Sequence, residues 1–142
     1  MKARTMIQSL AAVLISATLS CSLPASKLTI PEPVSVKQIV FSWSNSAPDG
    51  QEVVVTDPKT IERFMVFLQA RNSGWEKPWD TFPTPTCTIS LKDDKGLLLV
   101  VWLGQKWIGG REGNGDSSQN RLRSLSDLER SEALEILGIP KR

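Results

Sequence analysis

Four aromatic side chains of this sequence lie in or beside predicted loops and turns, where rings can meet a ligand. Trp75, Trp79 and Phe82 lie among the prolines at positions 78, 83 and 85, and Trp107 follows a tight turn. Rings in such places stack on sugars or on other flat apolar groups, so these four residues are our candidate ligand contacts. The opposing interpretation is that the same rings cover the open edge of a small core.

Histidine chemistry is excluded, because the sequence contains no histidine. This removes His-based triads, imidazole general bases and His-containing zinc sites, and two cysteines are too few for a four-thiolate zinc site. Of the two cysteines, Cys87 alternates in phase with Ile89 and Leu91, a pattern that predicts burial. We therefore expect Cys87 to be a small core residue, and we expect no cofactor or metal.

Carboxylates are the remaining catalytic option, as in glycoside hydrolysis, where two acids act across a cleft. Asp93 and Asp94 share a predicted turn, and Glu129, Glu132 and Glu135 recur along one side of a predicted C-terminal helix. Neither group is accompanied by a pocket signal, so we expect both to be solvated surface.

The N-terminus has the features of an export signal. Lys2 and Arg4 precede an uncharged run whose apolar centre, residues 10–15, is too short to span a bilayer. We predict a signal peptide over residues 1–20, or over 1–25 if cleavage falls later.

The end of this signal carries a resemblance to a known class of proteins. Thr18-Leu19-Ser20-Cys21 resembles a degenerate form of the cleavage box of bacterial lipoprotein precursors, with a small residue directly before the cysteine. The resemblance covers the leader only. It implies that Cys21 becomes a lipidated N-terminus at a membrane surface, and ordinary cleavage to a soluble periplasmic or secreted protein is the alternative.

The charge balance argues against nucleic acid as a partner. The chain has 17 Lys and Arg against 15 Asp and Glu, and the leader holds Lys2 and Arg4 but no acid. The rest of the chain is therefore balanced, unlike a surface that follows phosphates. The expected partners are the membrane, through a lipid on Cys21, and an unknown envelope protein or glycan.

The elements that must position these residues follow from periodicity. Residues 21–33 are rich in Ser and Pro and are predicted to be a tether, with a single domain over 34–142. Residues 109–119 hold four glycines and nothing apolar, and we expect a mobile surface loop there. Strands are predicted near residues 39–43 and 51–56, which form a hairpin across a turn at 46–50, and near 87–92 and 97–103. The run 97–103 is apolar on both sides and is expected to be the central strand, and a short edge strand begins at 107.

Two helices have clear start signals. Asp57 before Pro58 begins a helix that carries an apolar stripe through Ile61 and Leu68. Ser126 and Glu129 have capping-box spacing and begin a second helix, which Gly138 ends.

This order predicts an α+β domain. We expect a mainly antiparallel sheet of about five strands, in the order strand, strand, helix, three strands, helix, with one helix packed on a face and the other face open to water or a partner. The function we expect is that of a lipid-anchored envelope binding module without catalysis. A small carboxylate-dependent envelope hydrolase and a secreted inhibitor or immunity-type module are the alternatives.

Overall fold

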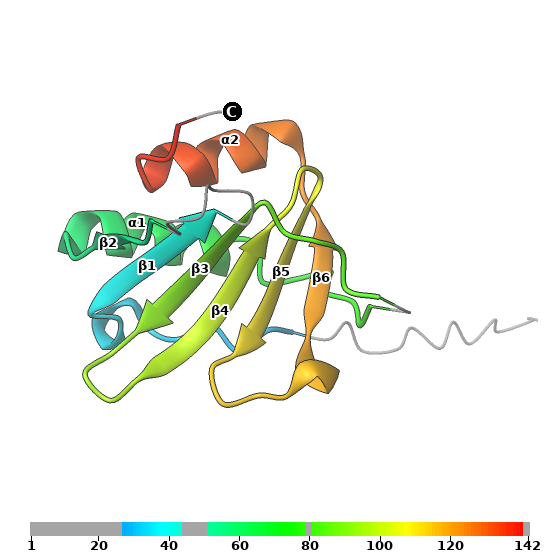
Figure 1. Cartoon of the computed structure of the whole chain (residues 1–142), viewed down its shortest axis with the longest axis horizontal. Helices are drawn as coiled ribbons and strands as arrows, with labels where there is room; N and C mark the ends of the chain where they lie inside the picture. Colours follow the sequence, from blue (N-terminus) through cyan, green and yellow to red (C-terminus); the bar gives the residue numbers. More distant parts are fainter. Residues whose placement is uncertain (1–26, 44–50, 79–80, 141–142) are drawn as a thin grey trace, which may run out of the picture.

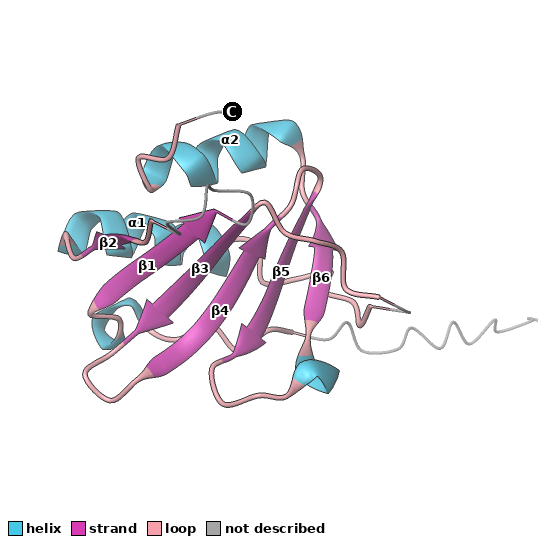
Figure 2. Cartoon of the chain, in the orientation of Figure 1, coloured by secondary structure: helices cyan, strands magenta, loops and turns pink. Residues whose placement is uncertain are grey.

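The computed structural model describes residues 27–43, 51–78 and 81–140. In these ranges the chain forms a six-stranded sheet with two helices (Figures 1 and 2). The elements are β1 (Gln38–Trp43), β2 (Val53–Val55), α1 (Pro58–Gln69), β3 (Cys87–Lys92), β4 (Leu97–Leu103), β5 (Trp107–Glu112), β6 (Arg121–Ser124) and α2 (Asp127–Ile136), with short 3-10 helices η1 (Pro33–Ser35) and η2 (Ser117–Gln119).

The strands lie in the order β2-β1-β3-β4-β5-β6, and every neighbouring pair is antiparallel. The expected α+β class and the hairpin of the first two strands are confirmed, whereas the expected number of about five strands is wrong. Residues 121–124 form a sixth strand, so β6 rather than β5 is the edge. The turn expected between β1 and β2, at residues 46–50, lies outside the described residues.

Helix α1 forms because local signals and a buried stripe agree. The Asp57 side chain accepts a hydrogen bond from the Thr60 N–H at 2.9 Å, and Pro58 occupies the first turn, where its missing N–H costs nothing. The buried side chains of α1 are Ile61, Phe64, Met65, Phe67 and Leu68. They are all at most 4% exposed, so α1 covers one face of the sheet, which we call the covered face.

Helix α2 begins with the expected capping box. The Ser126 Oγ accepts from the Glu129 N–H, and the Glu129 carboxylate accepts from the Ser126 N–H at 2.8 Å. Past its end, Gly138 adopts a positive φ of 66°. Because α2 also buries Ala133 and Leu134 in the core, the expectation of a single packed helix is wrong.

The glycine-rich segment differs most from its prediction. Residues 109–112 continue β5, and Gly109 and Gly110 are both buried between β4 and β6. A Cβ at Gly110 would collide with Leu28, and a Cβ at Gly109 would lie 2.7 Å from Phe82 Cζ on the opposite face. Two bare backbone positions therefore let the chain pack against both faces of β5.

The predicted tether is also shorter than expected. Leu28 is 3% exposed in the core, its N–H donates to Asn72 Oδ1 at 3.2 Å, and Ile30 packs against the same core. The domain therefore begins well before residue 34. Leu28 packs against the bare backbone of Gly110, a long-range contact that the sequence alone did not reveal.

Candidate functional site

The face of the sheet opposite α1, which we call the open face, is covered by neither helix. Residues directly opposite in an antiparallel ladder share a face, so the registers define its membership. Its strand side chains comprise cations, hydroxyl and amide groups and apolar groups, but no acid: Lys92 and Arg111; Gln38, Ser42, Thr88, Ser90 and Ser124; Val40, Val54, Leu97, Val100, Trp102, Trp107 and Leu122.

Three rings gather on this face and form the aromatic cluster of Phe82, Trp102 and Trp107. The Phe82 centroid lies 4.7 Å from that of Trp102 and 5.4 Å from that of Trp107, with interplanar angles of 64° and 89°. Phe82 reaches the sheet because Gly109 has no side chain beneath it. The guanidinium of Arg111 lies 5.6 Å from the Trp102 ring, so the cluster combines half-buried aromatic surface with a cation.

The structure separates the four predicted contact residues. It brings Phe82 and Trp107 together, but Trp75 is 1% exposed and belongs to the core, as the opposing interpretation held for all four. Trp79 lies outside the described residues. Sequence reasoning missed Trp102, because it treated the apolar run 97–103 as buried on both faces. Alternation within that run places Trp102 on the other face of the strand from Val101 and Leu103.

A shallow hollow adjoins the cluster beside β6. It measures about 360 Å³ and is lined by Gly74, Glu76, Trp107, Leu122, Arg123 and Ser124. The backbone of Glu76 pairs with that of Leu122, donating at 2.7 Å and accepting at 2.8 Å, so the loop after α1 forms one wall. The hollow thus offers an indole, a carboxylate, a guanidinium and a hydroxyl, groups that can contact a polar ligand with an apolar face.

Cys87 lies on the covered face with no exposed surface. Burial raises the pKa of its thiol to about 11, opposed by the nearby charge of Arg130. The thiolate is the reactive form, so this cysteine is poorly suited to be a nucleophile.

Two of the predicted carboxylates, Asp93 and Glu129, have structural roles. Asp93 Oδ1 accepts from the N–H groups of Lys95 and Gly96, at 2.7 and 2.8 Å, and so closes the β3–β4 turn. The hydrogen bond from the Ser126 N–H lowers the pKa of Glu129, burial opposes this, and Arg123 and Arg71 lower it further. Over residues 27–43, 51–78 and 81–140, no group of three potential metal-ligating side chains occurs.

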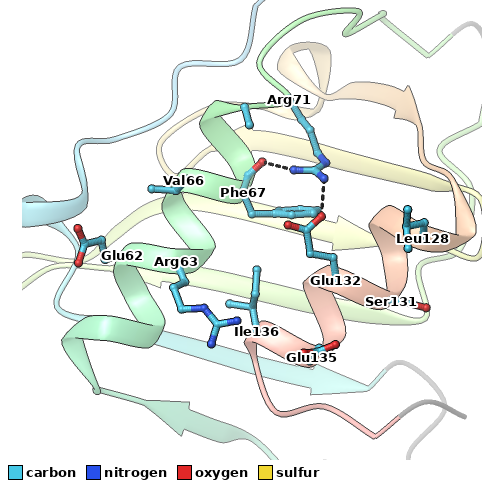
Figure 3. A pocket seen from close by; sticks show the side chains of 11 residues that line it. Glu62, Arg63, Val66, Phe67, Arg71, Leu128, Ser131, Glu132, Glu135 and Ile136 are labelled. Carbon is cyan, nitrogen blue, oxygen red and sulfur yellow. Dashed lines mark hydrogen bonds and ion pairs between the residues drawn. The ribbon is translucent and has the colours of Figure 1, made fainter.

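A second concavity runs between α1 and α2 on the helix side of the molecule (Figure 3). This helix groove measures about 720 Å³. It is lined by Glu62, Arg63, Val66, Phe67, Ala70 and Arg71 of the first helix and its end, and by Leu128, Ser131, Glu132, Glu135 and Ile136 of the second.

Arg71 closes one end of the helix groove. Its Nη2 lies 2.6 Å from Glu132 Oε2 and its Nε lies 3.1 Å from Glu129 Oε1, while Nη1 donates to the Phe67 carbonyl at 3.0 Å. The guanidinium also stacks 3.9 Å from the centroid of the Phe67 ring. Arg71 therefore holds α2 against α1 and has little capacity left for a ligand.

Comparison with known proteins yields a likeness of fold. No family model and no curated protein matches the chain. A solved structure described as "Putative Lipoprotein from Clostridium perfringens" superposes with a TM-score of 0.52 at 19% identity, covering 70% of this chain and 79% of that one. The two chains share a fold. In the described part of the chain, neither helix has the length and apolar character needed to cross a membrane.

Proposed function

We propose that this chain is an exported, lipid-anchored protein of the bacterial cell envelope whose α+β domain binds a partner there and catalyses no reaction. The open face carries this proposal, because it presents the aromatic cluster and two cations and neither helix covers it. The lipoprotein-like box ending at Cys21, which lies outside the described residues, supports the anchor. The description of the clostridial structure as a lipoprotein is consistent with it.

The proposed contact residues are Phe82, Trp107 and, in addition, Trp102. Aromatic faces bind the C–H faces of sugars and the apolar side chains of proteins, and the polar groups of the neighbouring hollow would fix a ligand's orientation. We therefore propose an envelope glycan or an envelope protein as the partner.

Hydrolysis by carboxylates has less support. Three glutamates line the helix groove, but Glu132 is bound to Arg71, and Figure 3 shows Glu62 on the side of α1 away from α2. The geometry of a glycosidase requires two carboxyl groups facing one bond across a cleft, and these groups do not converge in that way.

The anchor is tested by intact-mass analysis of the protein from membranes, beside a Cys21→Ala variant. We expect the wild-type N-terminus at Cys21 with the added mass of acyl chains, and we expect the variant to lack that mass. An unmodified N-terminus in the soluble fraction would contradict the anchor and leave a secreted domain.

Binding is tested with isolated peptidoglycan and with detergent extracts of the envelope, using wild-type protein and a Trp107→Ala variant. We expect co-sedimentation or a reproducible captured component, weakened at least about tenfold by the variant, as at interface hot spots. Val34→Ala is the control, because Val34 is 79% exposed and belongs to η1, outside the open face. Equal retention of wild-type and Trp107→Ala protein would contradict a role for the aromatic cluster.

A further inference from the structure

The helix groove has apolar side chains on both of its rims. Val66 of α1 is 54% exposed and Leu128 of α2 is 80% exposed, while Phe67 and Ile136 between them are at most 8% exposed. The groove therefore presents two apolar projections beside a hollow with an apolar floor.

The groove carries charges of both signs, and some of them form no ion pair among the described residues. Arg63 projects from α1 toward α2 near Ile136, and Glu135 lies nearby on α2 (Figure 3). Within the described ranges neither Arg63 nor Glu135 forms an ion pair, in contrast to Arg71 and Glu132. One helix thus offers an unpaired cation and the other an unpaired anion.

We propose that a second copy of this chain docks in the helix groove and forms a two-fold symmetric dimer. In such an interface the same patch meets itself, so a projection and a hollow on one copy face the hollow and the projection of the other. Leu128 and Val66 would fill the partner's groove, and Arg63 would face the partner's Glu135. An anionic bilayer fits less well, because Glu62, Glu132 and Glu135 line the groove.

This arrangement goes beyond the proposed function and is compatible with it. Helix α1 lies on the covered face, so a dimer joined through the groove leaves both open faces exposed on its outside. Two aromatic clusters on one assembly would bind a repeating partner, such as a glycan strand, more tightly than one cluster does.

The test is the mass of the full chain in mild detergent, by light scattering and sedimentation at protein concentrations from about 1 to 100 μM. We expect a concentration-dependent dimer, and we expect Leu128→Asp and Val66→Asp each to raise its dissociation constant at least about tenfold. Val54→Asp is the matched control, because Val54 is also 54% exposed but lies in β2 on the open face.

A charge reversal separates this interface from general instability. Arg63→Glu should weaken the dimer, because it brings like charges together, and Arg63→Glu with Glu135→Arg should restore it. Circular dichroism and thermal unfolding establish that each variant is folded. A monomer over the whole concentration range, or a dimer that the groove variants leave unchanged, would overturn the proposal, as would capture of a different protein by the groove of a monomeric chain.

Discussion

The two faces of the sheet differ in how completely their side chains are buried. On the covered face, β3 and β4 contribute Cys87, Ile89, Leu91, Leu99, Val101 and Leu103, and each of these side chains is 0% exposed beneath α1 and its neighbours. On the open face the same two strands contribute Thr88, Ser90 and Lys92 beside Val100 and Trp102. The first face is completely buried, whereas on the second only Val100 of these five is buried, at 7% exposed, and the other four are half-buried.

This difference supports our proposal that binding belongs to the less buried face. A small domain gains most of its stability from one well-packed layer, and so the composition of the other face is freer to serve binding. In our proposal the aromatic cluster on the open face serves binding, since its three rings are half-buried rather than enclosed in the core.

The strongest test of this contrast is Phe64→Ala. Phe64 is 0% exposed and its ring lies 5.9 Å from that of Phe67, so the truncation leaves a cavity in the covered layer. We expect a loss of about 3–5 kcal/mol in the free energy of unfolding, measured by chemical denaturation. A loss below about 1 kcal/mol would show that this layer is not the main source of stability.

The adjacent glycines of β5 allow the two faces to be compared at neighbouring positions. Gly110→Ala pushes against Leu28 in the core, and Gly109→Ala pushes against the half-buried Phe82. We expect losses of about 1–3 kcal/mol, the usual range for overpacking, with the larger loss at Gly110. Denaturation of both variants gives the order directly, and a larger loss at Gly109 would reverse our ranking of the faces.

Trp107→Ala should alter binding more than stability. Its ring is half-buried and contacts Phe82 edge-on, a contact that contributes about 0.5–1.5 kcal/mol. We therefore expect a stability loss of about 1 kcal/mol by denaturation, together with the loss of binding described above. A loss as large as that of Phe64→Ala would instead assign this ring to the core.

The smallest effect is expected at the start of α2. The pKa of Glu129 is held below its ordinary value of 4.5, chiefly by the Ser126 N–H, so its ionised form stabilises the fold. This contribution is fully present above pH about 4.5 and is lost as the pH falls through the lower folded pKa. Glu129→Gln should reduce stability by about 0.3–1 kcal/mol at neutral pH, and the difference should shrink below pH about 4.5. A difference that stays constant to pH 3 would contradict this origin.

The predictions from sequence succeeded where the signal was local. Asp57 with Pro58, and Ser126 with Glu129, specify helix starts through contacts within one turn, and both helices form as expected. The end of β5 and all of β6 were missed because their evidence is not local. Gly109 and Gly110 carry no side chain to show a period, and they become strand only through pairing with residues on β4 and β6.

The candidate site was only partly predictable for a similar reason. Trp75, Phe82 and Trp107 look alike in sequence, as rings near turns, and only tertiary packing sends one into the core and two onto the open face. Trp102 was hidden in an apolar run whose two sides differ only after the sheet has formed.

The burial of Leu28 limits how far the folded domain can lie from Cys21. Only residues 22–27 separate Cys21 from this fixed point, and an extended chain of that length reaches at most about 25 Å. With the lipid anchor that we propose, the domain is held close to one bilayer and meets its partners at the high local concentration of a surface. Lengthening the linker of residues 22–27 would therefore change which layers of the envelope the domain can reach, without changing the fold.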